Sequence, residues 1–558
     1  MDVKALLAKT FSLPNVTEEE IYSLIKKADG VQADYAMPCF KFAKAMGMPP
    51  QKIAENLASS ITDGLVREAK AVNGYLNMFL DRAYIQKTVL GDVVNDRLFD
   101  ETVGNGKTVC IDYSSINIAK PFHIGHLGTT AIGSALYKTY KALGYNVVGI
   151  NHLGDWGTQF GKLIVAYDLW GDKEAIDKGG VKALQEIYVR FHQEEEHNPQ
   201  LTDKAREWFL KIEQGDARAL ELFDYFKTIT LNEVKQVYQR LHVTFDSWNG
   251  ESFYNDKMQP VLDDLAQKGL TEVSDGATVV NLEEYNMPPC LLVKADGATL
   301  YATRDLAAAK YRYDTYNFDK CLYVVAYQQN LHFKQVFKVL ELAKFPWADR
   351  MEHVAYGMVS LADGSMSTRK GNAIWLSDVL DKAVNKAKDI IMQKSSTLEN
   401  KEEVAEQVGV GAVIFSALAN GRIKDIVFDY DRVLNFDGET APYLQYTHAR
   451  CHSIMTKAEK LDTSKFDVNH LAGDECWETV KEINRFGDVL ISVTEKNEPS
   501  LLSNYLLDLA QSFNRFYLAN RVIDDGKTCH ARLAVTVAIQ KILKKGLELL
   551  GISAPEKM

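Results

Sequence analysis

The stretch DYSSINIAKPFHIGHLG, residues 112–128, decides the fold that the sequence predicts. It follows a short apolar run at 109–111 that predicts a strand, and it leads into residues 127–143, whose apolar side chains can share one face of a helix. A second apolar run at 147–150 predicts the next strand. The order strand, loop, helix and strand is typical of a nucleotide-binding unit.

The loop of this unit carries the motif His-Ile-Gly-His, in which His123, Gly125 and His126 are the informative residues. Gly125 lets a ligand approach the backbone, and the start of the next helix offers free N–H groups to a phosphate. The two histidines add side-chain donors nearby. A metal site is the alternative, but no third ligand is evident in the sequence. The loop therefore predicts a phosphate-binding site.

Length and composition limit the class of protein that this chain can be. The chain has 558 residues, too many for one hydrophobic core, which predicts three or four domains. The start, MDVKALLAKTF, does not resemble a signal peptide, and no run of about 18 apolar residues occurs, which favours a cytoplasmic protein without a membrane span. Seven scattered cysteines without a C-x-x-C pair predict reduced thiols. A net charge of −11 argues against wholesale binding of a phosphate backbone but allows a local basic surface.

The sequence divides into three predicted domains. Residues 1–106 predict a small α/β module, in which Thr17 and Glu20 form a capping box and GYLNMFL alternates as a strand. Residues 107–404 alternate strands and helices, as in a Rossmann-like, doubly wound parallel sheet of the α/β class. Residues 405–558 show only helical periodicity and predict an all-α helical bundle.

The central domain contains further predicted features. Residues 171–240 predict a charged helical insertion whose acidic run at 194–196 is a solvated face. The sheet is predicted to resume near Ala277, and residues 354–361 predict a later strand. The segment VGNGKT is not a P-loop, because it precedes its strand and has Glu101 where the motif needs a glycine.

A second polar loop, DGSMSTRKGN, follows the strand predicted at 354–361. Its MSTRKG segment carries Arg369 and Lys370, for which an exposed turn would be the simplest explanation in isolation. However, the carboxyl ends of parallel strands meet at one edge of a sheet, so the two loops are expected to lie together. Two polar, cationic loops in that position can hold a triphosphate, and the pair therefore predicts ATP.

Longer strings identify a family. The segments IDYSSINIAKPFHIGHL, NHLGDWGTQFG, LYATRDLAAAKY, LHFKQVFKVL and APYLQYTHAR together resemble arginyl-tRNA synthetases, which are class I aminoacyl-tRNA synthetases with HIGH and KMSKS loops. The resemblance extends over nearly the whole chain. It implies that the N-terminal module contacts the elbow of the tRNA, that the helical bundle binds the anticodon, and that the protein is a monomer.

The resemblance also implies an activity, that of an arginine–tRNA ligase. The carboxylate of L-arginine would attack the α-phosphate of ATP to give arginyl-adenylate and pyrophosphate, and the arginyl group would then pass to the terminal ribose of tRNA(Arg). Mg²⁺ is expected to accompany ATP as part of the substrate complex. No tightly bound cofactor, zinc or other protein-held metal is expected.

The family's functional positions transfer to this sequence where its motifs match. For catalysis and ATP binding, the resemblance points to Lys120, His123, Gly125, His126, Met366, Ser367, Thr368, Arg369 and Lys370. For arginine binding, it points to Asp112, Asn117, His152, Tyr301, Asp305 and Gln329. For tRNA binding, it points to Tyr75, Asn77, Tyr443, Tyr446, His448 and Arg450, several of which are of the kind that stacks on unpaired bases.

Asp305 is the foremost predicted specificity residue. It lies four residues after Tyr301, so both side chains face the same way on a helix. A carboxylate recognises the planar guanidinium fork through paired hydrogen bonds that lysine cannot reproduce. Without the resemblance, an ion pair with Arg304 or Arg312 would be the favoured explanation of Asp305.

The sequence departs from the family at four positions. Ile116 stands where proline is usual and Gly128 where arginine is usual, while Ser365 and Thr368 replace the two lysines of KMSKS. Lys120, just before HIGH, matches a lysine that often accompanies this loss.

Two other functions stay open. One is a class I synthetase for glutamate, cysteine or lysine, although Asp112 and Asp305 would repel glutamate and no zinc-ligand set supports cysteine. The other is a non-catalytic relative that only binds tRNA. The altered MSTRKG loop favours this second alternative, whereas the intact His123 and His126 oppose it.

Overall fold

The computed structural model describes residues 3–558 except 12, 15, 29–32, 62–63, 362–373 and 395–397. The chain forms two compact units. The first comprises Met1–Phe99, Cys451–Gly487 and Asp508–Ile542, and the second comprises Asp100–Arg450, Asp488–Leu507 and Leu543–Met558. Outside the described residues lie the predicted ATP-binding or catalytic residues Met366, Ser367, Thr368, Arg369 and Lys370, together with Ser365.

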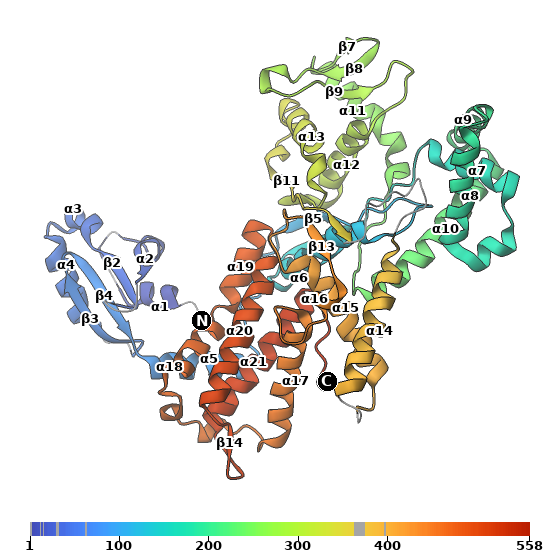
Figure 1. Cartoon of the computed structure of the whole chain (residues 1–558). Helices are drawn as coiled ribbons and strands as arrows, with labels where there is room; N and C mark the ends of the chain where they lie inside the picture. The colour runs from blue at the N-terminus through green and yellow to red at the C-terminus, as the bar shows by residue number, and fades with distance from the viewer. Residues whose placement is uncertain are drawn as a thin grey trace. The chain divides into compact units, whose positions relative to one another are not determined.

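The first unit contains a four-stranded antiparallel sheet in the order β1-β2-β4-β3 (Figure 1). Its strands are β1 (Lys26–Lys27), β2 (Tyr35–Pro38), β3 (Val66–Val72) and β4 (Tyr75–Leu80), and its helices are α1 (Val3–Lys9), α2 (Glu18–Leu24), α3 (Ala43–Met46) and α4 (Pro50–Ser60). The predicted alternation in GYLNMFL is confirmed, because Leu76, Met78 and Leu80 are buried. The predicted capping box is also present, with reciprocal bonds between Thr17 and Glu20.

The first unit also brings the N-terminal part of the chain together with two much later segments, residues 451–487 and 508–542. Helix α5 (Arg82–Val94) packs against α18 (Asp474–Asn484), and Gln86 Nε2 donates to the Leu471 carbonyl at 2.9 Å. Four helices contribute residues to both units: α17 (Ala441–Lys457), α19 (Phe486–Lys496), α20 (Ser500–Ala519) and α21 (His530–Leu549). The periodicity along the sequence does not reveal this grouping.

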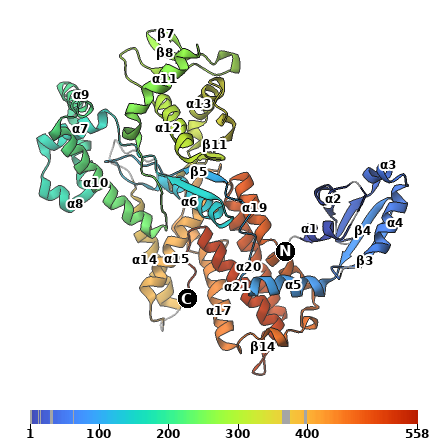
Figure 2. The same cartoon turned by 180° about the vertical axis from the view of Figure 1, so that it is seen from behind.

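The second unit is built on a parallel sheet in the order β11-β10-β5-β6. These strands are β5 (Thr108–Asp112), β6 (Asn146–Ile150), β10 (Lys320–Tyr323) and β11 (Met351–His353). Helix α6 (Leu127–Ala142) lies on one face, and α12 (Tyr301–Tyr316) and α13 (Asn330–Leu342) lie on the other (Figures 1 and 2). The predicted nucleotide-binding unit and the Rossmann-like α/β class are therefore confirmed.

Three predictions about strands need correction. The sheet does not resume near Ala277, because β8 (Ala277–Val280) pairs with β7 (Glu272–Ser274) and β9 (Cys290–Val293) in a separate antiparallel sheet. Residues 354–361 are not one strand, since only β12 (Val359–Leu361) is extended, and it pairs in parallel with β13 (Ile426–Phe428). β13 and the hairpin of β14 (Ile523–Asp524) and β15 (Lys527–Thr528) also show that the region after 405 is not helical throughout.

The predicted helical insertion is confirmed, and it begins earlier than expected. It consists of α7 (Thr158–Trp170), α8 (Lys173–Glu195), α9 (Gln200–Glu213) and α10 (Ala217–Arg240). A small core formed by Val165, Ala166, Phe191, Leu201 and Ala205 holds α7, α8 and α9 together. The insertion therefore has apolar packing of its own.

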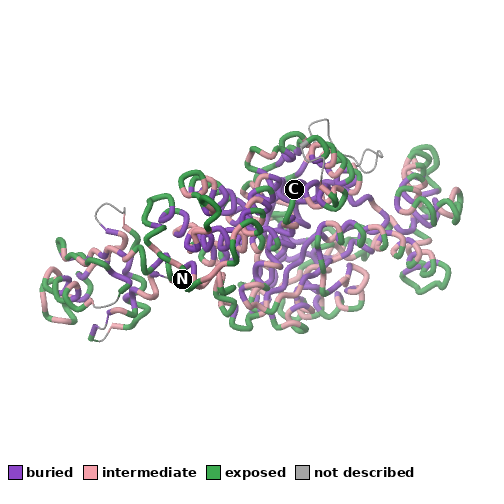
Figure 3. Tube along the Cα trace, turned by 90° about the horizontal axis from the view of Figure 1, so that it is seen from below, coloured by how far each residue is buried: buried purple, intermediate pink, exposed green. Residues whose placement is uncertain are grey.

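The remaining helices of the second unit are α11 (Met258–Gln267), α14 (Leu376–Lys394), α15 (Lys401–Leu418) and α16 (Tyr430–Val433). Helix α15 packs between α14 and α6 and is buried over most of its length. Figure 3 shows the buried residues running through the inner stretches of the helices and strands, with the exposed residues on the outer helices and connections. No helix in the described part of the chain is long and apolar enough to cross a membrane.

Candidate active site

Backbone hydrogen bonds tie the HIGH loop to residues that are distant in sequence. Ile124 N–H donates to the Ile374 carbonyl at 3.0 Å, and Leu376 N–H donates to the Phe122 carbonyl at 2.9 Å. His123 and Trp375 face each other in an antiparallel bridge between these bonds. Ile374 is the first described residue after the MSTRKG loop. The chain that leaves this loop therefore lies beside the HIGH motif.

The two histidines of HIGH are held by their own backbone. His123 Nδ1 accepts a hydrogen bond from Gly125 N–H at 3.1 Å, and His126 Nδ1 accepts one from His123 N–H at 3.2 Å. The ring centroids lie 4.0 Å apart. Because His123 Nδ1 accepts, the neutral ring of His123 carries its proton on Nε2, where it can be donated to a ligand. His126 Nδ1 lies 3.3 Å from the His123 carbonyl as well, so the tautomer of His126 depends on which of these two bonds it makes.

Burial keeps these histidines neutral. It lowers the pKa of His123, and burial together with the neighbouring His123 lowers the pKa of His126 to about 3. Both rings are therefore uncharged hydrogen-bond donors at neutral pH, rather than cations. Donors of this kind suit an oxygen on which negative charge develops.

A cavity of about 460 Å³ lies at the carboxyl ends of β5, β6 and β10 in the second unit. All six predicted arginine-contact residues line it, namely Asp112, Asn117, His152, Tyr301, Asp305 and Gln329. They come from segments up to 217 residues apart in sequence, from Asp112 to Gln329. The sheet edge brings them together, as expected for an open α/β sheet. We call this space the arginine cavity.

Asp112 is held at the bottom of the arginine cavity by a buried cation. Its Oδ2 lies 2.6 Å from Arg312 Nη2, and its Oδ1 accepts from Ser115 Oγ at 2.6 Å. Only 7% of the Asp112 side chain and 1% of the Arg312 side chain are exposed. Beside this pair, burial lowers the pKa of His152 and keeps that ring neutral. Asp112 therefore belongs to a sealed ion pair as well as to the cavity wall.

Asp305 has a different partner from either arginine considered above. Its Oδ2 lies 2.5 Å from His332 Nε2, at the start of α13. About a fifth of each side chain is exposed, so the pair opens onto the cavity. Burial raises the pKa of Asp305, but the hydrogen bond from His332 and the electrostatic effects of His332, His152 and Arg312 together outweigh burial, and the pKa is lowered overall. Asp305 is therefore an ionised carboxylate facing the cavity.

Glu251 is a further carboxylate in the same wall that the sequence did not indicate. Burial raises its pKa to about 7, against a smaller opposite effect from Arg304. Its side chain accepts no hydrogen bond from any described residue. A largely buried carboxylate without a donor is favourable only when a cation approaches it.

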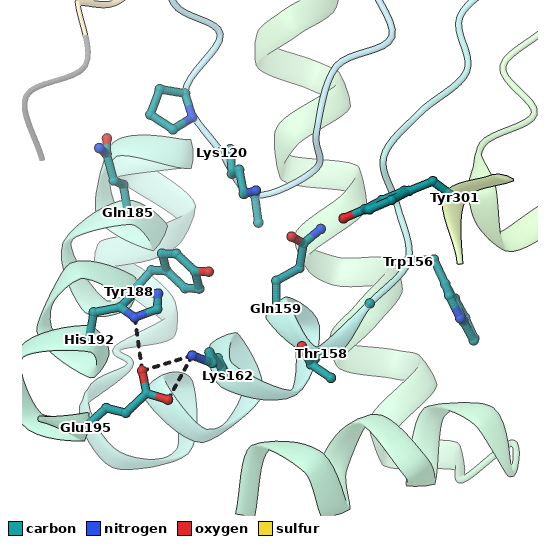
Figure 4. Close-up of a pocket in the computed structure, with 13 residues that line it drawn as sticks. Lys120, Trp156, Thr158, Gln159, Lys162, Gln185, Tyr188, His192, Glu195 and Tyr301 are labelled. Atoms are coloured by element: carbon teal, nitrogen blue, oxygen red, sulfur yellow. Dashed lines mark hydrogen bonds and ion pairs between the residues drawn. The ribbon is translucent and has the colours of Figure 1, made fainter. Parts of the chain in front are cut away.

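A second and larger cavity, of about 550 Å³, lies between the segment before HIGH and the helical insertion (Figure 4). Lys120 reaches it from the segment before HIGH and Gln159 from the start of α7, Tyr188 and His192 line it from α8, and Tyr301 reaches in from the side opposite Tyr188 (Figure 4). Tyr301 lines both cavities. We call this space the insertion cavity.

The insertion cavity corrects one prediction. Glu195, expected on a solvated face, is mostly buried and accepts hydrogen bonds from Lys162 at 2.8 Å (Figure 4) and from Thr202 at 2.6 Å. Lys162 and Thr202 belong to α7 and α9, so the carboxylate links three helices of the insertion. The charge pattern alone did not show that the acidic run has one inward-facing member.

The metal alternative gains no support from the geometry. In the part of the chain that the structure describes, no group of three or more His, Cys, Asp or Glu side chains is placed to hold a metal ion.

Comparisons with known proteins place this site in a family. The model for the catalytic domain of class I tRNA synthetases (R) matches residues 88–430. The DALR anticodon binding domain matches residues 444–558, and the arginyl tRNA synthetase N terminal domain matches residues 2–80. The chain belongs to the arginyl-tRNA synthetase family. 

Individual relatives agree with this assignment. The chain is 48% identical to the arginine–tRNA ligase of Alkaliphilus metalliredigens over 98% of its length and 97% of the relative. It is also 48% identical to that of Clostridioides difficile, with the same coverage. Among solved structures, it is similar to Thermus thermophilus arginyl-tRNA synthetase with a TM-score of 0.79, 26% identity and coverage of 100% and 99%. The Plasmodium falciparum enzyme shares the fold, with a TM-score of 0.77, 23% identity and coverage of 100% and 98%.

Gly128 is a departure from the usual family sequence that has a local explanation, whereas nothing in the structure explains isoleucine at position 116 in place of proline. A Cβ at Gly128 would lie 2.9 Å from the Tyr356 ring, so a larger residue there requires Tyr356 to move. Ile116 is buried, and its carbonyl accepts from Gly154 N–H at 2.8 Å. Ser365 and Thr368 lie outside the described residues.

The residues predicted to contact tRNA in this arginyl-tRNA synthetase differ widely in accessibility. Tyr446 is half exposed on α17, and Tyr75 on β4 is exposed beside Phe40. Tyr443, Arg450 and Asn77 are partly exposed. His448 is a correction, because it is fully buried and its Nδ1 lies 2.8 Å from the Pro555 carbonyl. It faces inward on α17 and cannot stack on a base in this arrangement.

Among the residues that line or underlie the arginine cavity, sequence reasoning missed Glu251, Arg304, His332 and Arg312. His332 lies in LHFKQVFKVL and Arg304 in LYATRDLAAAKY, two strings that carry the family resemblance, so those strings were the available signal. Nothing in the pattern around Glu251 or Arg312 indicates that either side chain faces this site.

Proposed function

We propose that this protein attaches L-arginine to tRNA(Arg) in two steps, with arginyl-adenylate as the intermediate. The observation that carries the proposal is the arginine cavity, which lies beside the HIGH loop and is lined by every residue predicted to contact arginine. Membership of the family supports the same activity.

In the first step, the carboxylate of arginine attacks the α-phosphate of ATP. The nucleophile is already ionised, so no general base is needed and catalysis depends on positioning and charge stabilisation. His123 and His126 donate through Nε2–H to the phosphate oxygens on which charge accumulates. Lys120, Arg369 and Lys370 supply positive charge for the leaving pyrophosphate, in place of the lysines missing from KMSKS.

Arginine specificity comes from Asp305 and Glu251. These two carboxylates face the cavity, and neither is committed to a fixed cationic lysine or arginine partner. Together they offer several acceptor oxygens to the five N–H groups of a guanidinium. Asp112 contributes less, because Arg312 and Ser115 already engage both of its oxygens. Tyr301 closes the mouth of the cavity, and Asn117, His152 and Gln329 orient the rest of the substrate.

In the second step, the terminal ribose of tRNA attacks the carbonyl of arginyl-adenylate and releases AMP. The 2′-hydroxyl is the class I nucleophile implied by the family resemblance. The 3′ end of the tRNA reaches the adenylate by way of the insertion cavity, which adjoins the arginine cavity at Tyr301. Tyr446, Tyr443 and Arg450 on α17 bind the anticodon region, and Tyr75 and Asn77 bind the tRNA elbow.

The proposal extends to the setting of the reaction. Mg²⁺ enters with ATP as part of the substrate. The protein works as a monomer in the cytoplasm, with a catalytic domain at 107–404 flanked by the tRNA elbow domain at 1–106 and the anticodon-binding domain at 405–558. The composition and the family resemblance support these points.

ATP–pyrophosphate exchange with each amino acid in turn tests the function. The assay is run with and without tRNA(Arg), because the family resemblance implies that activation can require tRNA. Exchange that depends on arginine, with tRNA present, is the expected result. Exchange with another amino acid would point to a different class I synthetase, and no exchange with any amino acid would indicate a protein that only binds tRNA.

A further inference from the structure

Arg304 stands apart from the other cations around the arginine cavity. Its side chain lines the cavity wall, and its Nε is shielded from solvent without a hydrogen-bond partner. No carboxylate lies within ion-pair distance of its guanidinium in the described structure. Arg312 also has shielded nitrogens without a hydrogen-bond partner, Nε and Nη1, but its guanidinium is paired with the Asp112 carboxylate. An arginine that lines a cavity wall without a carboxylate partner calls for an anion from outside the chain.

The position of Arg304 on its helix strengthens this requirement. It lies at the end of the first turn of α12, which contains no acidic residue and has no side-chain hydrogen bond at its N-cap, Leu300. The helix dipole opposes a cation at this end and favours an anion. Both the guanidinium and the start of the helix therefore attract negative charge to the same place.

The neighbours of Arg304 show where the anion must come from. Tyr301, one turn earlier, is 68% exposed and lines both the arginine cavity and the insertion cavity. The charge of Arg304 acts on Glu251 in the arginine cavity and on Glu213 in α9 of the insertion, lowering the pKa of each against the larger effect of burial. It is not among the charges that act on the HIGH histidines. Arg304 therefore lies in the wall of the arginine cavity, one helical turn from Tyr301, which borders both cavities.

Three anions take part in the proposed reaction: the carboxylate of arginine, the phosphates of ATP, and the backbone of tRNA. The ATP phosphates belong to the HIGH side, and the carboxylate of arginine must face the α-phosphate there. The terminal ribose of tRNA must reach the adenylate inside the arginine cavity. The phosphate on the 5′ side of that ribose then lies at the mouth, beside Tyr301 and Arg304.

We infer that Arg304 binds the phosphate joining the last two nucleotides of tRNA, and so fixes the 3′-terminal ribose against the adenylate. This inference rests on the proposed function. It makes Arg304 a tRNA-positioning residue within a pocket that otherwise recognises a cation. A guanidinium suits the role because its planar fork binds two phosphate oxygens at once.

Aminoacylation kinetics of Arg304→Ala and Arg304→Lys test the inference. Arg304→Ala is expected to raise KM for tRNA(Arg) roughly ten- to a hundredfold, as for loss of a hydrogen bond to a charged group, while KM for arginine and ATP change by less than about twofold. Arg304→Lys is expected to recover part of the loss, because lysine keeps the charge without the fork. Lys310→Ala is the matched control, since Lys310 is an exposed residue of the same helix that pairs with Asp314, and it should leave all three constants unchanged.

A truncated tRNA locates the contact. Arg304→Ala should weaken the binding of intact tRNA(Arg), but wild type and variant should bind equally well to tRNA lacking its last nucleotide, which removes the phosphate in question. The salt dependence of intact tRNA binding should become shallower by about 0.7 in log–log slope, as for one single-strand phosphate contact. Equal folding of the variants is checked by circular dichroism, and Arg304→Lys keeps the test usable if the alanine variant is unstable.

Several outcomes would overturn the inference. A rise in KM for arginine with KM for tRNA unchanged would assign Arg304 to the carboxylate of arginine. An equal loss of affinity for intact and truncated tRNA would place the contact elsewhere on the nucleic acid. Failure of the proposed function would look different, because wild type itself would then form no arginyl-tRNA(Arg).

Discussion

Two carboxylates that line one cavity, Asp112 and Asp305, are held in contrasting ways. Asp112 is sealed against Arg312, with almost no exposure of either side chain, whereas Asp305 meets His332 at a partly open edge. If the buried Arg312 were removed, the Asp112 carboxylate would stay buried without a counter-ion. His332, at the partly exposed edge, can instead share the Asp305 carboxylate with the guanidinium of an incoming substrate. The contrast separates a pair that builds the cavity from a pair that serves the substrate.

The largest effect is expected from breaking the sealed pair. Arg312→Met leaves the Asp112 carboxylate buried without its counter-ion, which should lower the free energy of unfolding by about 3–5 kcal/mol. Urea denaturation measures the loss. The double variant Arg312→Met with Asp112→Asn should regain part of it, because the stranded charge is removed. Stability equal to wild type in the single variant would show that the pair is not sealed.

A change in the partly open pair of Asp305 and His332 should alter the affinity for arginine rather than the stability of the fold. Asp305→Ala is expected to weaken the binding of arginine by roughly 2–5 kcal/mol, which is the cost of removing one partner from a buried charge pair. KM for ATP should stay within about twofold of the wild-type value. Steady-state aminoacylation over a range of arginine concentrations gives both values. An unchanged KM for arginine would remove Asp305 from the recognition of the guanidinium.

Glu251 adds a pH dependence to the open side of the cavity. Its pKa, raised to about 7 by burial, means that the carboxyl group takes up a proton as the pH falls through neutrality. Only the ionised form attracts a guanidinium, so KM for arginine should rise between pH 8 and pH 6. Glu251→Gln should have a higher KM at pH 8 and a flatter profile. The same slope in wild type and variant would assign the titration to another group.

The smallest effect is expected from His332→Asn. The pair with Asp305 is partly exposed, so its loss should change the free energy of unfolding by no more than about 1 kcal/mol. KM for arginine should change only a few fold, because Asp305 keeps its carboxylate. A stability loss as large as that of Arg312→Met would erase the distinction between the two pairs.

The local part of this architecture could be predicted from the sequence. The strand, loop, helix and strand around HIGH were correct, because short apolar runs and helical periodicity are properties of neighbouring residues. The loop conformation was not predictable in the same way. Ser114, Ser115 and Ala119 adopt positive φ, and hydrogen bonds from the Ser114 and Ala119 N–H groups to the hydroxyl oxygens of Thr129 and Thr230 hold the backbone of this loop. Such support comes from distant residues that no local pattern identifies.

The site shows the same limit. The family strings led to six residues that line one cavity, yet they did not show that Asp112 is engaged by a residue 200 positions later. His448 was chosen for its chemistry, although the helix turns it toward Pro555. Motifs therefore locate a site, whereas the charge state and partners of each side chain depend on packing.

The most direct test of the central claim, that two carboxylates select a guanidinium cation, compares arginine with citrulline as substrates for charging tRNA(Arg). Citrulline has nearly the same shape but a neutral urea group in place of the guanidinium. Wild type should charge tRNA(Arg) with arginine and show a value of kcat/KM for citrulline lower by about a thousandfold, within the range for an unpaired buried charge. Comparable charging with citrulline, or no charging with arginine, would contradict the account.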